Sequence, residues 1–263
     1  MIHSPKELVK RPNILVMTAT ITPPASVPFL ARNDPRLRLK DYEESLKFYL
    51  PLINQCISTI VFAENSNSDI SSLQDLVDRA GFNKQVEFLV FEGLDYPPSY
   101  GRAYGEFKLI DYAMEHSQII KNQDQEAIIW KVTGRYIVKN LCQIIARKPS
   151  NFDIYCNFRK VPKPWADMFL LAWTLEGYQD CLYNIYPQLA SSYDTCTLHP
   201  EEIFIDLLEQ RAAKNINIVK RLNPNPMISG IRGSDNQNYL EGRNLLKFYL
   251  RSIGQKLFPS LWI

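Results

Sequence analysis

The sequence lacks the features that most readily assign a chain to a class. Its five cysteines include no Cys-x-x-Cys pair and no paired spacing, so the sequence gives no sign of a disulfide framework. No apolar run is long enough for a signal peptide or a membrane span, and the first residues, around His3 and Lys6, are polar. Internal repeats and low-complexity tracts are absent, and no linker divides the chain. We therefore expect one domain over residues 1–263.

The composition is that of an ordinary globular protein. Of 263 residues, 46% are hydrophobic and 22% are charged, which is ample material for the core of one large α/β domain. Cys56, Cys142 and Cys156 lie within apolar runs, where a cysteine usually behaves as a small buried hydrophobe. These thiols favour a reducing, cytoplasmic compartment.

Charge is distributed unevenly along the chain. From Arg211 onward there are nine Lys and Arg and two acidic residues, a net charge of +7, whereas the whole chain carries +2 and the first 210 residues therefore −5. A basic end on a mildly acidic body indicates contact with an anionic surface or ligand. Nucleic acid is not expected, because the cations are not interleaved with aromatic residues on one obvious face.

Apolar runs alternate with helical patterns. Strands are expected at residues 13–18, 57–63, 86–91, 127–138, 152–158 and 169–174, and helices at 41–50, 71–80 (with Ser71 as a possible cap), 105–117, 175–186 and 199–209. Strands separated by helices predict an α/β domain with a mostly parallel central sheet and helices on both faces. Ligands of such sheets bind at the carboxyl ends of the strands.

The most informative segment is Ala127 to Val138. An apolar run leads directly into Lys131, Thr133 and Arg135, with Gly134 at a bend. Cations are rarely buried without an anionic partner, so either a protein carboxylate or a phosphate is expected to meet them. The segment alone leaves both possibilities open.

Polar loops follow the other strands. Thr18 and Thr20 can meet a base or ribose, and Glu64 can accept from a nucleobase or ribose hydroxyl, although the Asn- and Ser-rich loop up to Asp69 is also typical of a turn. After the third strand, Arg102 offers a fork for phosphate at the start of a helix. This loop matches neither the P-loop nor the dinucleotide fingerprint.

The run from Ile60 to Asp69 resembles the second-strand signature of GT-A glycosyltransferases (sugar-transferring enzymes with a Rossmann-like fold). Glu64 stands where those enzymes place the acid that reads the base, and Asp69 at the closing Asp. The helix led by Gly101 to Glu106, followed by Lys131-Val-Thr-Gly-Arg-Tyr136, resembles bacterial polysaccharide-synthesis members of this superfamily. The resemblance covers about residues 14–140 and implies a GT-A-like fold and a nucleotide-sugar donor. The residues then assigned to the donor are Thr18, Thr20, Glu64, Asp69, Arg102, Glu106, Lys131, Thr133, Arg135 and Arg232.

One departure from that family concerns the metal. GT-A enzymes commonly hold a divalent ion with an Asp-x-Asp motif, which this chain lacks, and Lys131 and Arg135 fall where the motif is expected. Cations in a partly dry site can neutralise a diphosphate as a metal does. We therefore expect no metal and no cofactor, with these two side chains taking the role of the ion and Arg102 assisting them.

The second half, about residues 150–235, is expected to serve the acceptor. Glu201 and Glu202 open a helix after Pro200. They either complement the helix dipole or provide the general base for an acceptor hydroxyl, with His199 as the other candidate base. The segment Met227 to Ser234 contains two glycines and can form a loop over the donor, with Arg232 reaching phosphate.

The last segment, residues 239–263, predicts a basic amphipathic helix ending in Leu261-Trp-Ile263. Such a helix either docks on the protein core or rests on an anionic membrane surface. The second use would give a cytoplasmic enzyme peripheral on the inner face of the membrane.

Three functions remain open at this point. The first is a glycosyltransferase in cell-surface polysaccharide synthesis, acting on a glycan or lipid-linked glycan. The second is a nucleotidyltransferase acting on a sugar phosphate, which normally needs acidic metal ligands and a Gly-rich, basic first loop. The first loop here, residues 18–24, is neither Gly-rich nor basic. The third is a non-catalytic nucleotide- or carbohydrate-binding module.

Overall fold

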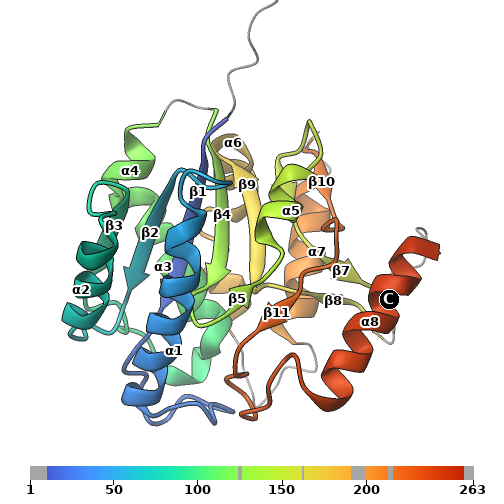
Figure 1. Ribbon diagram of the computed structural model, residues 1–263. Helices are drawn as coiled ribbons and strands as arrows, with labels where there is room; N and C mark the ends of the chain where they lie inside the picture. Colours follow the sequence, from blue (N-terminus) through green and yellow to red (C-terminus); the bar gives the residue numbers. More distant parts are fainter. Residues whose placement is uncertain (1–10, 124–125, 162, 191–198, 213–215, 258–263) are drawn as a thin grey trace, which may run out of the picture.

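A seven-stranded sheet forms the centre of the molecule (Figure 1). The computed structural model describes residues 11–123, 126–161, 163–190, 199–212 and 216–257. The strand order is β10-β6-β9-β4-β1-β2-β3, and only β9 runs against its neighbours β4 and β6. The strands are β1 Asn13–Ala19, β2 Thr59–Glu64, β3 Val86–Val90, β4 Ile128–Thr133, β6 Ile154–Tyr155, β9 Leu170–Thr174 and β10 Ile218–Val219. The expected α/β class and mostly parallel sheet are confirmed.

Helices cover both faces of the sheet because its strands are apolar on both sides. In β1, Ile14 and Val16 belong to one buried cluster, whereas Leu15 and Met17 belong to the other. The first cluster includes side chains of α3 and α7, and the second those of α1, α2 and α5. The bounds are α1 Pro35–Tyr49, α2 Ser71–Ala80, α3 Gly101–His116, α5 Leu141–Ala146 and α7 Pro200–Ala212; the short α4 spans Gln118–Lys121.

Several helix ends differ from the expectation for local reasons. Helix α1 begins six residues before Asp41, because Asp34 accepts hydrogen bonds from the backbone N–H of Arg36 and Leu37 and Pro35 occupies the first turn. Helix α2 has the expected bounds and ends at Gly81 with φ of 76°. Its first residue is Ser71, which does not cap it; instead the carboxylate of Asp69 accepts from the Ser71 N–H.

Three predicted elements are broken up in the structure. The stretch 127–138 forms β4 and, after the bend at Gly134, β5 Ile137–Val138, which pairs with β11 Ile228–Ser229. The stretch 152–158 forms β6 and β7 Phe158–Arg159, which pairs with β8 Trp165–Ala166. In place of one helix over 175–186 there are a turn of α-helix (α6, Leu175–Gly177), a π-helical turn and a 3-10 turn at Tyr186–Leu189. The C-terminal helix α8 spans Gly242–Leu257.

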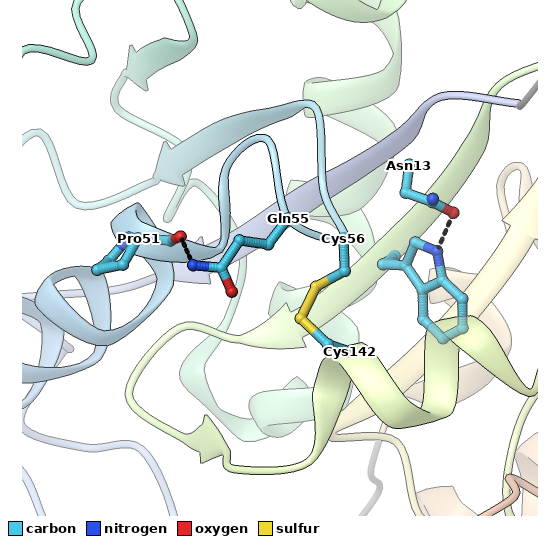
Figure 2. The surroundings of a disulfide bond; sticks show 6 residues. Asn13, Pro51, Gln55, Cys56 and Cys142 are labelled. Atoms are coloured by element: carbon cyan, nitrogen blue, oxygen red, sulfur yellow. Dashed lines mark hydrogen bonds between the residues drawn. A yellow bond between two sulfur atoms is a disulfide. The ribbon is translucent and has the colours of Figure 1, made fainter.

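The prediction for Cys56 and Cys142 is wrong, because these residues form a disulfide bond. Figure 2 shows the bond joining the loop before β2 to helix α5, two segments 86 residues apart in sequence. Cys156 is a buried free thiol, as expected. Disulfides are rare in reducing compartments, so this bond counts against the cytoplasmic location expected from the sequence, which stays a prediction. Among the described residues, no helix has the length and apolar character needed to cross a membrane.

The disulfide predicts a measurable dependence of stability on redox state. Reduction, or replacement of both Cys56 and Cys142 by Ser, should lower the free energy of unfolding by about 2–4 kcal/mol, because the bond restricts the unfolded chain. Denaturant titrations with and without reductant measure this difference. Complete alkylation of Cys56 in denaturant without reductant would show that the bond does not form.

Candidate active site

A cavity of about 960 Å³ opens where β1 and β4 end. The start of β9 borders it too, because β9 is antiparallel and its first residue, Leu170, pairs with Val132 near the end of β4. Helix α3, the start of α7, the β11–α8 segment and α8 complete the wall. Its polar and aromatic lining residues include Thr18, Thr20, Arg38, Arg102, Glu106, Thr133, Arg135, Arg159, Trp165, Asp167, His199, Glu201, Arg232, Tyr239, Lys247 and Arg251.

An ion pair between a fully buried lysine and a half-buried glutamate forms the floor of the cavity. Lys131 Nζ lies 2.7 Å from a Glu106 carboxylate oxygen and donates to the carbonyl of Met168 at 2.7 Å. The hydroxyls of Thr18 and Thr133 each donate to the same carboxylate at 2.8 Å. Burial alone would raise the pKa of Glu106, but Lys131 and the two hydroxyls hold it below its ordinary value. The pKa of Lys131 is lowered by burial, which Glu106 opposes.

This geometry changes the expected role of Lys131. The side chain is fully buried, does not line the cavity, and has a carboxylate partner. Of the two possibilities left open by the sequence, a protein carboxylate therefore accounts for Lys131. Its charge is neutralised beneath the floor and is not offered to a ligand.

Two arginines, in contrast, converge on one point of the cavity wall. A Cβ atom added to Gly233 would lie 3.0 Å from Arg135 Nη2 and 3.3 Å from Arg102 Nη1. Arg135 is buried, donates to the carbonyl of Ile231 at 3.1 Å, and lies 3.6 Å from Asp41. Its Nε is buried without a hydrogen-bond partner. The two guanidinium groups therefore place positive charge at one location.

The carboxylates nearby neutralise this charge only in part. Asp41 is held more closely by Arg32, which donates to both of its oxygens at 2.7 and 3.0 Å. Arg102 is exposed, and within the described part of the chain it makes no ion pair or hydrogen bond through its side chain. Arg38 is buried and donates to the carbonyls of Thr20 and Arg32 at 2.7 and 2.9 Å, not to a carboxylate. The wall thus carries a surplus of cations suited to an anion.

Arg232 also lines the cavity but has its own partners. It forms an ion pair with Asp235 and donates to the side-chain oxygen of Gln237 at 3.0 Å. It belongs to the segment between β11 and α8, where the sequence predicted a loop over the donor. Its charge is largely compensated in this arrangement.

The loop after β2 is arranged differently from the expectation. Glu64 is fully buried and accepts from the backbone N–H of Ile21, Ser66 and Ser68 at 2.9–3.1 Å. It does not line the cavity, because its oxygens connect the loops after β1 and β2. Asp69 is exposed at the start of α2 and lies outside the lining as well. Thr20 does line it, and its hydroxyl donates to Asn65 at 2.7 Å.

Besides Glu106 in the floor, the cavity is lined by two acidic residues from the second half of the chain. Glu201 lines the cavity at the start of α7, and burial raises its pKa although Arg102 and His199 oppose the shift. Burial likewise raises the pKa of Asp167, although Arg159 lies 4.0 Å away and Asn157 donates to it at 2.9 Å.

Glu202 and His199, the other two candidates for the base, lie differently. Glu202 points to Lys163 at 3.4 Å and accepts from the His199 N–H at 2.9 Å, so it caps the helix and is not part of the lining. His199 is exposed, lines the cavity and packs against Trp165 with ring centroids 5.3 Å apart.

Sequence reasoning missed several lining residues. Asp167 precedes a strand, and only the antiparallel direction of β9 brings that end of the strand to the site. Arg38 was placed in a loop because the start of α1 was predicted too late. No local signal marked Arg159 and Trp165 of the β7–β8 pair. Lys247 and Arg251 belong to the predicted basic C-terminal helix, but the sequence did not place them at the cavity.

Comparisons with known proteins give no family for this chain. No family model matches it, and no curated protein matches it. Among solved structures, a putative nucleotide-diphospho-sugar transferase from Desulfovibrio desulfuricans G20 is similar with a TM-score of 0.45 and 10% identity over 80% of each chain. A 4-diphosphocytidyl-2C-methyl-D-erythritol synthase is similar with a TM-score of 0.45 and 8% identity, over 92% of this chain and 98% of the other. The bifunctional glycosyltransferase WbbM is similar with a TM-score of 0.43 and 9% identity, over 82% of this chain and 39% of the WbbM chain. Similarity at this level says nothing about activity.

The ion pair in the floor predicts a large effect on stability. Lys131→Met should lower the free energy of unfolding by roughly 3–5 kcal/mol, because it leaves the half-buried Glu106 charged without its cation. Adding Glu106→Gln should recover part of this loss, since the amide keeps an acceptor for the two threonine hydroxyls. Denaturant titrations of the two variants measure both effects. A Lys131→Met protein of unchanged stability would contradict the assignment.

Proposed function

We propose that this protein is a glycosyltransferase that transfers a sugar from a nucleotide-sugar donor to a hydroxyl of a glycan or lipid-linked glycan, in cell-surface polysaccharide synthesis, without a metal ion. The observation that carries the proposal is that one cavity is lined both by an arginine cluster, which Asp41 compensates only in part, and by carboxylates whose pKa is raised by burial. The cluster consists of Arg38, Arg102 and Arg135.

The donor diphosphate is assigned to the arginine cluster. The guanidinium groups of Arg102 and Arg135 lie beside Gly233, which has no side chain that could block a ligand from reaching them. Guanidinium groups bind phosphate oxygens through paired N–H donors, and they stabilise the charge that develops on the leaving nucleoside diphosphate. This is the task that a divalent ion performs in related chemistry, so we expect the cluster to replace it.

The nucleoside is assigned to the loop after β1. Thr18 and Thr20 line the cavity there with Pro23 and Pro24. Glu64 fixes this loop through the Ile21 N–H, so its role in nucleotide selection is indirect: it positions the groups that contact the nucleoside. The position of Glu106 and Thr133 in the floor indicates that they, too, contribute shape and rigidity more than charge.

The acceptor is assigned to the wall formed by α7 and the β7–β8 pair. Glu201 acts as the general base: it accepts the proton of the acceptor hydroxyl while that oxygen bonds to the anomeric carbon and the bond from this carbon to the diphosphate breaks. A pKa raised by burial brings a carboxylate closer to the operating pH, which favours this role. Glu202 is occupied by the helix cap and Lys163.

The carboxylates also favour transfer to a hydroxyl over nucleotidyl transfer. A sugar phosphate is already an anion at neutral pH, so it needs no base to attack a nucleoside triphosphate. A hydroxyl acceptor does need one. The appearance of pyrophosphate from nucleoside triphosphate and sugar phosphate would identify the nucleotidyltransferase instead.

Arg102 provides the first test. Arg102→Ala should weaken nucleoside diphosphate binding roughly tenfold to a hundredfold, since a hydrogen bond to a charged group contributes about 1.5–3 kcal/mol. The fold should persist because the side chain is exposed. Calorimetric titration with a panel of nucleoside diphosphates in EDTA measures the change. Arg79→Ala, an exposed arginine on α2, is the matched control. Equal affinities for wild type and the Arg102 variant, or binding that requires manganese, would refute the assignment.

Glu201 provides the second test. Glu201→Gln should lower kcat by about 10²–10⁴-fold and leave nucleoside diphosphate affinity unchanged, whereas Glu202→Gln should change kcat little. Because the pKa of Glu201 is raised, the acidic limb of the wild-type rate profile should lie above the ordinary glutamate pKa of about 4.3, and activity should fall as pH drops through it. Release of nucleoside diphosphate from a panel of sugar nucleotides is the assay. A Glu201→Gln enzyme of normal kcat would exclude this residue as the base.

A further inference from the structure

Helix α8 has two chemically distinct faces. One face contacts the protein: Ser252 Oγ lies 3.2 Å from the Asn225 amide nitrogen, and the Gln255 amide donates to the carbonyl of Leu222 at 2.8 Å. Phe248 and Arg251, on the same face, line the cavity. These residues recur at intervals of three and four, as the buried face of a helix does.

The opposite face is apolar and exposed. Five large hydrophobic residues on it are 52–66% exposed, and they make up half of the large hydrophobic residues classed as exposed in the described ranges. Their spacing places them along one stripe of the helix. In Figure 1, α8 lies at the edge of the molecule, away from the central sheet. We define the apolar stripe as Leu246, Tyr249, Leu250, Ile253 and Leu257.

We propose that the apolar stripe docks on a lipid membrane containing anionic headgroups. A contiguous exposed apolar surface on a folded protein usually marks an interaction site. The sequence of α8 contains four cations and no acidic residue. Lys247 and Arg251 line the cavity, whereas helical spacing puts the positions of Arg243 and Lys256 at the two edges of the stripe, where their charge complements an anionic surface. The chain continues into the apolar sequence Leu261-Trp-Ile263, which lies outside the described residues.

A second copy of the chain fits the stripe less well. A helix of 16 residues is about 24 Å long and about 10 Å wide, so it offers roughly 240 Å² to a partner. A stable interface needs about 800 Å² on each side. A membrane surface has no such requirement, because apolar side chains and basic residues contribute independently to the binding.

The position of the helix connects this surface to the cavity. Lys247 and Arg251 belong to the lining, so α8 is a wall of the cavity as well as the docking element. If the protein is the transferase proposed above, docking brings the acceptor end of the cavity next to the membrane, which makes a lipid-linked glycan the acceptor. This last step rests on the proposed function, whereas the docking itself does not.

Vesicle flotation of the full chain tests the docking. We expect binding to phosphatidylcholine vesicles containing 30% phosphatidylglycerol, weaker binding at high salt, and a loss of roughly tenfold or more in Leu250→Glu/Ile253→Glu. Leu37→Glu, at an exposed leucine of α1, is the matched control and should bind like wild type. Far-UV circular dichroism checks that all variants are folded.

Other occupants of the stripe give different results. Failure of the wild type to bind, or equal binding by the double variant, would overturn the proposal. A dimer in light scattering that the double variant turns into a monomer would assign the stripe to a second copy. Loss of binding only on deletion of residues 258–263 would assign the contact to the tail. Because nucleoside diphosphate binding is measured separately, failure of docking leaves the proposed function standing, and the reverse holds as well.

Discussion

The ion pair between Lys131 and Glu106 is the interaction on which the site depends. It connects β4 to α3, and through Thr18, Thr133 and the Met168 carbonyl it also holds the end of β1 and the start of β9. A buried pair is stable only when its remaining donors and acceptors are satisfied. Here five groups from four segments meet this condition together, so the segments that surround the cavity are fixed relative to one another.

Because the ion pair in the floor carries no net charge, the residues of the walls determine the charge that the cavity offers to a ligand. With Lys131 compensated, the positive charge available to a ligand comes from Arg38, Arg102 and Arg135. Backbone carbonyls hold Arg38 and Arg135, Arg135 also lies 3.6 Å from the aspartate that binds Arg32, and Arg102 is exposed. Such a surplus is costly in a partly dry cavity unless an anion binds there. The same cavity holds carboxylates whose pKa is raised by burial. The cavity therefore combines cations suited to a diphosphate with carboxylates suited to a hydroxyl that must lose a proton.

The sequence predicted the elements whose signals are local. The apolar run of β1 and the helix from Ser71 to Gly81 are recognisable because their residues suffice to define them, and the cavity lies at the carboxyl ends of the parallel strands as expected. The sequence did not predict which groups individual side chains contact. Whether Lys131 meets phosphate or carboxylate depends on Glu106, 25 positions earlier, and Glu64 becomes a loop anchor only through backbone N–H groups of another loop. The pairing of Cys56 with Cys142 and the place of Asp167 depend on topology in the same way.

The most direct test of the central claim is a crystal structure of the protein with a nucleoside diphosphate in the presence of EDTA. We expect diphosphate oxygens in contact with the guanidinium groups of Arg102 and Arg135 beside Gly233, with the Lys131–Glu106 pair intact below them. A diphosphate bound at any other surface, or one that displaces Glu106 to bond with Lys131, would contradict that claim.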